Sequence, residues 1–258
     1  MIGKFLSGEA AAFRHLHRDS VGSTNTDLIE LAHNGDPGNL WLTAGEQVTG
    51  RGSRGRNWVS VSGNLYSSLL LIEPSDIRHF HELTFVAAVA LRNALTRMSG
   101  DKLKFQVKWP NDVLCEGKKC TGILLEAGRF AKVSYVVIGM GTNVSIFPSD
   151  TLHQATSLHH EGIDVTPSEV FIILAAEMAK VLKLWDKGAG FSHILNAWRQ
   201  HAFGMGDVTT VRMPNGEKFS GRFASIDDKG YMILETDDCG KRRISTADIF
   251  FGDLDSKD

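Results

Sequence analysis

The sequence predicts an α+β protein in which a larger domain, with helices packed on a sheet, is followed by a small β-barrel. Apolar residues recur at helical spacing between His81 and Ser99, which is typical of a helix with one face on a sheet. Apolar runs at 120–127 and 133–141 indicate a buried β-hairpin. From Gly204 onward, short strands alternate with turns, which indicates a small barrel.

Composition limits the class of protein. The 258 residues suffice for one large domain, or for one domain and a smaller one. Hydrophobic residues at 42% and charged residues at 22% are ordinary for a soluble globular protein. The net charge of −2 provides no overall field that would attract nucleic acid.

Targeting signals and cysteine usage indicate the compartment. The apolar run within residues 1–12 is too short for a signal peptide, and no apolar stretch is long enough to span a membrane. The cysteines are odd in number and form no Cys-x-x-Cys pair: Cys115, Cys120 and Cys239. This argues against a disulfide framework and for a reducing compartment. We therefore expect a cytoplasmic protein with no membrane contact.

The first predicted elements are a short helix and a strand. Polar cap candidates at 23–25 precede an apolar segment at 27–32, which ends at Asn34-Gly35, so a short helix is expected. The alternative interpretation is that residues 23–25 only cap this helix and bind no ligand. Residues 40–44 then form a strand that leads into an arginine-rich loop.

This arginine-rich loop, from Gln47 to Trp58, is well suited to binding an anion. It carries three glycines and three arginines within residues 50–56. Glycine lets backbone N–H groups approach a ligand closely, and arginine supplies a charged fork that matches phosphate or carboxylate oxygens. The alternative is a solvated, arginine-rich surface loop without a ligand.

Two nucleotide-binding patterns overlap the loop, but neither fits. The Gly-x-Gly-x-x-Gly pattern at 50–55 counts only between a strand and a helix. Here residues 58–61 and 65–72 read as strands on either side of a turn. A near match to the phosphate-binding loop at 45–52 lacks the Lys and the Ser/Thr that hold phosphate and Mg²⁺.

An alternating strand at 103–109 ends in a polar turn. Its apolar residues share one face and its polar residues the other, the last of them being Lys108. The strand stops at Pro110, and Asn111 and Asp112 follow as a turn. Lys108 is therefore expected to project beside an amide and a carboxylate, although an ordinary hairpin with one polar side has the same pattern.

The remaining elements are a glycine-containing hairpin, two helices and four strands. Gly122 within the first hairpin strand indicates a bulge or the close approach of a ligand. A capping box predicts a helix from Pro167 to about Asp186, and a second helix spans 191–201. The final strands are expected at 208–212, 218–223, 231–235 and 241–245. We place the domain boundary near Gly204, giving domains 1–203 and 204–258.

Taken together, these stretches resemble the biotin–protein ligases over nearly the whole chain. Five features occur in the family's order and at its usual spacings: the Ser23-Thr24-Asn25 turn, the arginine-rich loop, and the segments 108–112, 119–126 and 139–143. The resemblance implies a mixed sheet with helices on one side, related to class II aminoacyl-tRNA synthetases, and then an SH3-like barrel. About 20 residues precede Ser23, too few for the DNA-binding winged helix of some members. We therefore expect no repressor function and no DNA partner.

The function implied by the resemblance is ATP-dependent ligation of biotin. ATP and biotin give biotinyl-5′-AMP and pyrophosphate. A specific lysine of a biotin carrier domain, in acetyl-CoA carboxylase or a related carboxylase, then attacks the mixed anhydride. Because the biotin carboxylate and the α-phosphate are both anions, positive charge must be aimed at the developing charge. Mg²⁺ is expected to accompany ATP without a dedicated protein site, and the protein is expected to be a monomer or a homodimer.

The resemblance also assigns roles to individual residues. Lys119 is expected to contact both the biotin carboxylate and the α-phosphate, with Arg51 and Lys108 completing the catalytic set. The expected biotin-binding residues are Ser23, Thr24, Asn25, Gln47, Gly50, Arg51, Gly52, Ser53, Lys119 and Gly122. The expected nucleotide-binding residues are Arg54, Arg56, Trp58, Asn111, Asp112 and Asn143. Asp112 would act either through Mg²⁺ or by orienting Lys108.

One position departs from the family pattern. The family loop usually reads Gly-Arg-Gly-Arg-Arg-Gly-Arg, whereas here the middle basic position is Ser53. That position is expected to help order the loop over the adenylate. We hypothesise that Ser53 leaves the intermediate less securely held unless another cation compensates; the alternative is a neutral variation.

Two other functions remain open at this point. A lipoate or octanoate protein ligase or transferase shares the catalytic fold, but the arginine-rich loop and the turn at 109–112 look like the biotin branch. A non-enzymatic nucleic-acid binder would use the arginine-rich loop and the basic segment 241–243, with binding that weakens as salt rises. The net charge of −2 argues against this second alternative.

Overall fold

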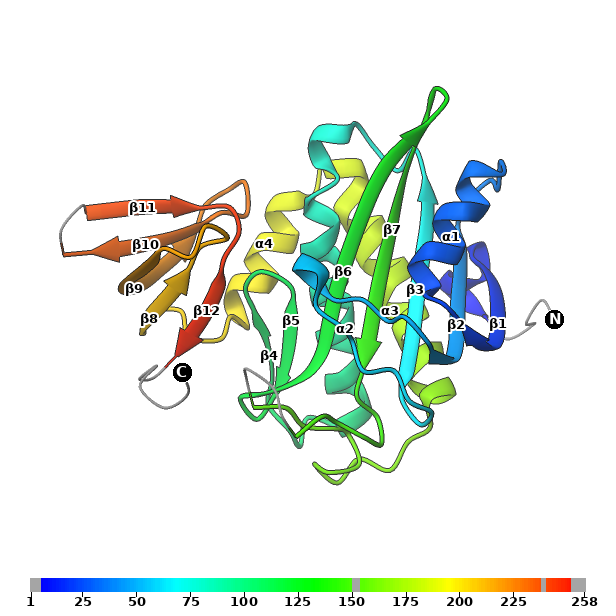
Figure 1. Cartoon of the computed structure of the whole chain (residues 1–258), viewed down its shortest axis with the longest axis horizontal. Coiled ribbons are helices and arrows are strands. Elements are labelled where there is room, and N and C mark those ends of the chain that lie inside the picture. Colours follow the sequence, from blue (N-terminus) through cyan, green and yellow to red (C-terminus); the bar gives the residue numbers. More distant parts are fainter. Residues whose placement is uncertain (1–5, 150–153, 238–239, 252–258) are drawn as a thin grey trace.

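A computed structural model describes residues 6–149, 154–237 and 240–251, so Cys239 lies outside the described residues. Seven strands form the large sheet in the order β1-β2-β3-β7-β6-β5-β4 (Figure 1). Their bounds are β1 (Arg14–Val21), β2 (Leu40–Gln47), β3 (Leu65–Ile72), β4 (Phe105–Lys108), β5 (Asp112–Cys115), β6 (Lys118–Phe130) and β7 (Val133–Thr142). Because β1 and β2 are parallel and the other neighbours antiparallel, the sheet is mixed.

Four α-helices accompany the strands in the described part of the chain: α1 (Thr24–His33), α2 (Glu82–Ser99), α3 (Pro167–Trp185) and α4 (Phe191–Gln200). Each confirms a helix expected from the sequence. The capping box at the start of α3 is present, since the Thr166 side chain accepts from the Glu169 N–H and Glu169 accepts in return from the Thr166 N–H. Within the described ranges, no helix is both long and apolar enough to cross a membrane.

The helices lie on both faces of the large sheet. Leu70 of β3 and Val137 of β7 pack in a cluster with Leu28 of α1, whereas Leu69 and Ile138, which point the opposite way, belong to the main core with α2 and α3. The expectation of helices on one side is therefore wrong for α1. Strands β3 and β7 are apolar and buried on both faces, so a single helical layer would leave one face uncovered.

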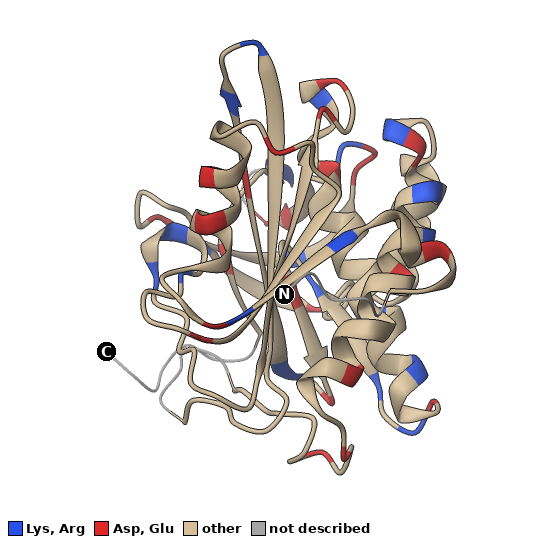
Figure 2. Cartoon of the chain, turned by 90° about the vertical axis from the view of Figure 1, so that its right-hand side faces the viewer, with Lys and Arg blue, Asp and Glu red and all other residues tan. Residues whose placement is uncertain are grey.

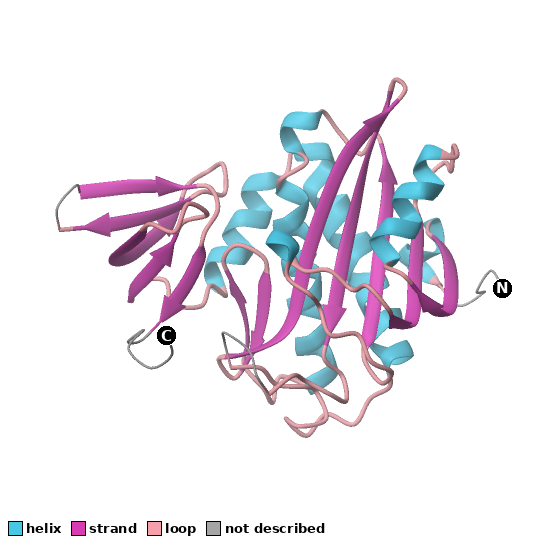
Figure 3. Cartoon of the chain, viewed as in Figure 1, coloured by secondary structure: helices cyan, strands magenta, loops and turns pink. Residues whose placement is uncertain are grey.

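The C-terminal strands, labelled in Figure 1, form an antiparallel sheet in the order β11-β10-β9-β8-β12, and Figure 3 shows these strands apart from those of the large sheet. Their bounds are β8 (Val208–Arg212), β9 (Lys218–Ile226), β10 (Met232–Thr236), β11 (Gly240–Ile244) and β12 (Asp248–Phe251). The first four confirm the expected strands, and β12 is additional. Among the described residues this pairing order is that of an open sheet, so its closure into an SH3-like barrel stays a prediction.

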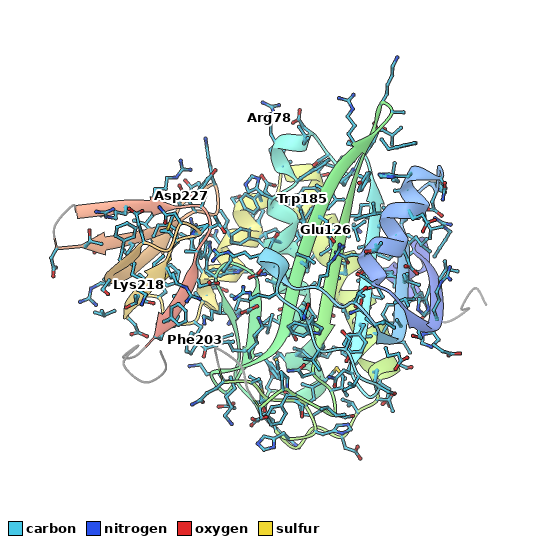
Figure 4. All side chains as sticks on the ribbon, viewed as in Figure 1. Arg78, Glu126, Trp185, Phe203, Lys218 and Asp227 are labelled. Carbon is cyan, nitrogen blue, oxygen red and sulfur yellow. The ribbon has the colours of Figure 1, made fainter. Side chains whose placement is uncertain are left out.

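The C-terminal sheet packs against the large domain through α4 and the β4–β5 turn. Trp109 Nε1 donates to the Gly230 carbonyl at 3.0 Å, and Arg199 Nη2 of α4 donates to the Ile226 carbonyl at 2.7 Å. Phe203, labelled at this junction in Figure 4, meets Phe251 edge to face with ring centroids 5.0 Å apart. These contacts hold β12 close to the end of β4.

Two sequence expectations differ from the structure near this region. Residues 58–61 form no strand but an irregular segment, whose Ser60 carbonyl accepts from the Gln47 N–H at 3.1 Å. Lys108, expected on an open polar face, is only 7% exposed. The C-terminal sheet covers that face, with the Phe251 ring centroid 5.8 Å from Lys108 Nζ.

Surface charge is mixed. Figure 2 shows Lys and Arg residues interspersed with Asp and Glu on the side of the molecule that carries the N-terminus. With a net charge of −2, this distribution gives the nucleic-acid alternative no broad basic surface on that side.

Candidate active site

A cavity of about 270 Å³ opens on the α1 face of the large sheet, between the start of α1 and the arginine-rich loop. The structure brings most of the expected site residues to its lining: Ser23, Thr24, Asn25, Gln47, Arg51, Gly52, Ser53, Arg56, Trp58, Asn111, Asp112, Lys119, Gly122 and Asn143. Among the described lining residues, Gly50, Arg54 and Lys108 do not appear. Residues of β7 that the sequence did not single out as ligand-binding, Gly139 and Gly141, also contribute.

Three glycines in the cavity lining bring the main chain of β6 and β7 close to two side chains. A Cβ atom added at Gly122 would lie 2.7 Å from the Trp58 ring, and one at Gly141 would lie 2.6 Å from it. A Cβ at Gly139 would collide with the Asn25 side chain. The three glycines therefore let an indole and an amide lie directly on the backbones of β6 and β7.

One wall of the cavity is a set of hydrogen-bonded polar side chains. Gln47 Oε1 accepts from the Thr24 N–H at 2.9 Å and from Thr24 Oγ1 at 3.0 Å, while Gln47 Nε2 donates to Ser60 Oγ at 3.0 Å. Ser68 Oγ of β3 donates to Asn25 Oδ1 at 2.6 Å. Since these side chains hold one another, their orientation does not depend on a ligand.

Glu126 joins this wall to the arginine-rich loop. Its Oε2 accepts from Asn25 Nδ2 at 2.8 Å and from Arg51 Nη2 at 3.1 Å, so one carboxylate fixes two of the expected ligand-binding residues. Figure 4 labels Glu126 on the large sheet. The sequence motif contained Glu126 but gave it no role; its position two residues after Leu124, on the same face of β6 as Gly122, is the signal that was available.

Cationic groups gather at the opposite end of the cavity. Lys119 Nζ lies 5.5 Å from the Trp58 ring centroid and 2.6 Å from Asp112 Oδ1. Burial lowers the pKa of Lys108 to about 8, against a smaller opposing effect of Asp112, and the nearby charge of Lys119 lowers it further. Lys108 therefore lies close to the Lys119–Asp112 pair, behind the cavity lining.

The two predicted amides are engaged with main chain. Asn111 Nδ2 donates to the Ile123 carbonyl at 2.6 Å, and Asn143 Nδ2 donates to the Thr156 carbonyl at 2.9 Å. Both residues line the cavity. They fix the segments around it, and each retains its carbonyl oxygen as a possible acceptor for a ligand.

The arginine-rich loop folds back on itself as a narrow turn. The Gly52 N–H donates to the Arg56 carbonyl at 2.7 Å, and the Trp58 N–H donates to the Gly50 carbonyl at 3.0 Å. At the tip, Arg54 and Gly55 have left-handed backbone, with φ of 59° and 71°. Arg54 lies outside the cavity, whereas Arg56 lines it.

The cavity lining contains both neutral hydrogen-bonding side chains and cationic side chains. Within residues 6–149, 154–237 and 240–251, no group of three or more His, Cys, Asp or Glu side chains is arranged to hold a metal ion. The cavity instead combines neutral hydrogen-bonding groups on its polar wall with the cationic side chains of Lys119, Arg51 and Arg56, and Arg51 pairs with Glu126 beside that wall. This arrangement suits a ligand with an uncharged polar head and an anionic end.

Family matches cover most of the chain. Residues 19–143 match the Biotin/lipoate A/B protein ligase family, and residues 208–252 match the Biotin protein ligase C terminal domain. A biotin–[acetyl-CoA-carboxylase] ligase of Paracoccus denitrificans is 37% identical over 237 residues, which cover 89% of this chain and 97% of the relative. The bifunctional ligase/repressor BirA of Bacillus subtilis is 35% identical over 92% of this chain and 74% of its own length.

Solved structures agree with the sequence matches. The biotin protein ligase of Aquifex aeolicus in complex with biotin and ATP superimposes with a TM-score of 0.78 and 26% identity, covering 92% of this chain and 97% of that chain. A point mutant of the same enzyme in complex with biotin gives a TM-score of 0.79 and 25% identity, covering 92% of this chain and 98% of that chain. Similarity therefore extends across the large sheet and the C-terminal sheet together, and this chain belongs to the biotin–protein ligase family.

Proposed function

We propose that this protein activates biotin with ATP to form biotinyl-5′-AMP, and then transfers the biotinyl group to a specific lysine of a biotin carrier protein. The observation that carries the proposal is the position of Lys119. Lys119 lines the cavity, and its ammonium group lies 2.6 Å from Asp112 Oδ1 and 5.5 Å from the Trp58 ring, where a carboxylate and a phosphate would meet.

The polar wall suits the head group of biotin. The ureido ring of biotin offers one acceptor and two donors, and Thr24, Asn25 and Gln47 supply hydroxyl and amide groups of both kinds. With the head group on this wall, the valeryl chain runs along the cavity and its carboxylate approaches Lys119. Gly50 contributes indirectly, because its carbonyl accepts from the N–H of Trp58, whose ring lies beside Lys119.

The remaining lining residues suit the nucleotide. Lys119, Arg51 and Arg56 place positive charge where the carboxylate oxygen attacks the α-phosphorus and pyrophosphate departs. Trp58 packs near the adenine, and Asn111 and Asn143 contact the nucleotide. Arg54 does not line the cavity in this structure, so its effect on the phosphates is through the loop.

Mg²⁺ belongs to the ATP substrate in this proposal. Asp112 has the oxygen donors that Mg²⁺ prefers, but it is already paired with Lys119 Nζ at 2.6 Å. We therefore assign Asp112 first to orienting the Lys119 ammonium. Lys108 acts on the same pair through its charge, since it is buried beside both residues.

In the second step, the amine of the carrier lysine attacks the carbonyl carbon of biotinyl-AMP. The new amide bond forms as the C–O bond to phosphate breaks, AMP leaves, and the amine loses a proton to solvent. The partner is the carrier domain of acetyl-CoA carboxylase or a related carboxylase. We further propose a catalytic domain at 1–203 related to class II synthetases, an SH3-like domain at 204–258, a cytoplasmic location and a monomeric or homodimeric state.

The test is biotin-dependent ATP–pyrophosphate exchange, run beside lipoate and a control without acid. Exchange with biotin alone is the expected result. Exchange with lipoate alone would instead assign the chain to the lipoate branch of its family. If neither acid supports exchange, the proposed activity is wrong.

A further inference from the structure

A single carboxylate of the C-terminal sheet receives guanidinium groups from both domains. Asp248, at the start of β12, forms ion pairs with Arg54 Nη1 at 2.9 Å and with Arg56 Nη1 at 3.2 Å, both in the arginine-rich loop. It also pairs with Arg212 Nη2 of the neighbouring strand β8 at 3.3 Å. The Asp248 side chain is only 11% exposed, whereas Arg54, Arg56 and Arg212 are 28%, 48% and 38% exposed, so the carboxylate is buried beneath three partly solvated guanidinium groups.

A second contact from the same segment holds the loop. Arg54 Nη2 donates to Thr246 Oγ1 at 3.3 Å, joining positions 192 residues apart in the chain. Arg54 is thus held by two residues of the C-terminal segment, Thr246 and Asp248. Arg56 is held by Asp248 and also by Ser53, whose carbonyl and Oγ accept from Nε at 3.2 Å and from Nη2 at 2.9 Å.

Apolar packing does not hold this part of the loop. The single turn η2 (Ser53–Gly55), which is entirely described, buries none of its residues. Arg54 and Arg56 carry like charges two positions apart and would repel each other without a shared counter-ion. Burial raises the pKa of the Asp248 carboxyl, but Arg56, Arg54 and Arg212 together bring it below its usual value, so the carboxylate is ionised at neutral pH.

The carboxylate reaches the loop from outside the cavity. Among the described residues that line the cavity, Arg56 is present, whereas Arg54, Arg212 and Asp248 are not. Asp248 therefore does not occupy the place of a phosphate. Asp248 contacts the arginine-rich loop on the side away from the cavity. It can therefore position the loop without competing with a ligand for the arginines.

We propose that Asp248 is a positioning residue for the nucleotide, which fixes Arg54 and Arg56 so that the C-terminal sheet controls the arginine-rich loop without touching substrate. This inference rests on the proposed function, because the nucleotide is the ligand that the loop serves. The polar wall that would hold biotin lies on α1, β2 and β3, and makes no use of Asp248. Loss of Asp248 should therefore weaken ATP binding and leave biotin binding nearly unchanged.

The kinetic test compares Asp248→Asn with wild type in ATP–pyrophosphate exchange, using the full chain. We expect the KM for ATP to rise about tenfold, which is the scale of one charge-assisted contact, and the KM for biotin to stay within about twofold. Asp248→Glu should recover part of the loss. Glu235→Gln, which removes an exposed carboxylate 3.3 Å from Lys241 in the same sheet, should change neither constant.

Trypsin cleavage after Arg54 and Arg56 provides a measurement that does not require activity. Freed from Asp248, the loop should be cut several-fold faster in Asp248→Asn, and Thr246→Val, which removes only the second contact of Arg54, should show a smaller increase. Equal cleavage of variant and wild type would overturn the inference, as would a lowered KM for ATP or an equal rise in both KM values. If the wild type shows no exchange at all, the proposed function fails, and cleavage still decides whether Asp248 holds the loop.

Discussion

Lys119 Nζ lies 2.6 Å from Asp112 Oδ1, across the neighbouring strands β5 and β6 and inside the cavity. The pair sits beside a register shift between Val113 and Leu114, which changes the pairing of the two strands at this point. The ammonium group is therefore fixed before any substrate arrives. In the proposed reaction, an incoming carboxylate and phosphate would share it with Asp112 rather than recruit it from solvent.

Lys119→Ala should abolish adenylate formation. In the proposed mechanism this charge would lie where the carboxylate meets the α-phosphate. Its removal is expected to lower the exchange rate at least about 100-fold, as for other groups that stabilise transition-state charge. The matched control is Lys118→Ala, whose side chain pairs with Glu161 at 3.0 Å away from the cavity lining. Near-normal exchange by Lys119→Ala, or loss of its folded circular dichroism spectrum, would contradict the assignment.

Glu126→Gln should weaken biotin binding about fivefold to tenfold, because Arg51 loses its ion pair and Asn25 its charged acceptor. Calorimetric titration with biotin alone measures this without the nucleotide. The control is Glu217→Gln. Glu217 is an exposed residue just before β9, and its carboxylate accepts from Asn215 Nδ2, so this variant should bind biotin like the wild type. Unchanged affinity in Glu126→Gln would show that the polar wall keeps its geometry without this carboxylate.

Gly122→Ala should raise the KM for ATP about tenfold by displacing Trp58. The new methyl group would start 2.7 Å from the indole, and accommodating such overpacking costs about 1–3 kcal/mol. Gly22→Ala is the control, since its Cβ meets only Thr49 Oγ1 at 3.6 Å. Equal kinetics in the two variants would mean that the position of the indole does not matter for the nucleotide.

Ser53→Arg should slow the release of biotinyl-5′-AMP several-fold, if the middle basic position of the family loop retains the adenylate. The rate is measured by chasing bound labelled adenylate with unlabelled ligand. Ser53→Ala separates charge from hydrogen bonding, because it removes only the 2.9 Å bond from Arg56 Nη2. Identical off-rates for wild type and Ser53→Arg would identify Ser53 as a neutral variation.

Lys108→Met should stabilise the fold at pH 7. Burial brings the pKa of Lys108 from 10.5 to about 8, so the folded state releases this proton at lower pH than the unfolded state. Below pH 8 both states are protonated and the cost of the buried charge is fully present; as pH rises from 8 to 10.5 that cost is relieved. The variant should therefore exceed wild type by up to about 3 kcal/mol at about pH 7 and by less at about pH 10.

Urea denaturation at the two pH values measures this difference. Lys104→Met, which changes an exposed lysine just before the same strand, should show no such pH-dependent gain. A wild type more stable than Lys108→Met at pH 7 would mean that the attraction of Lys108 to Asp112 and Asp248 outweighs the cost of its burial.

Much of the site was predictable because its residues occur in short motifs. The segments 108–112, 119–126 and 139–143 and the loop at 47–58 each bring several lining residues to the cavity. Contacts between segments far apart in the sequence could not be predicted. Asp248 meets the loop only after the C-terminal sheet has packed against β4, and nothing near residue 248 in the sequence indicates this.

The fold was predicted best where strands are buried and worst where they are exposed. Strand β1 was not expected, since most of its residues are exposed at the sheet edge and no apolar alternation marks them. The burial of Lys108 was missed for the converse reason. Its strand alternates like a half-solvated one, but a second domain covers the polar face.

Gly122, Gly139 and Gly141, on which Trp58 and Asn25 lie, restrict which residues of the cavity lining can be substituted. A side chain at any of these three positions would add atoms where the indole of Trp58 or the amide of Asn25 already lies. A change in the acid that the proposed site accepts would therefore be sought in the polar wall, at Thr24, Asn25 and Gln47.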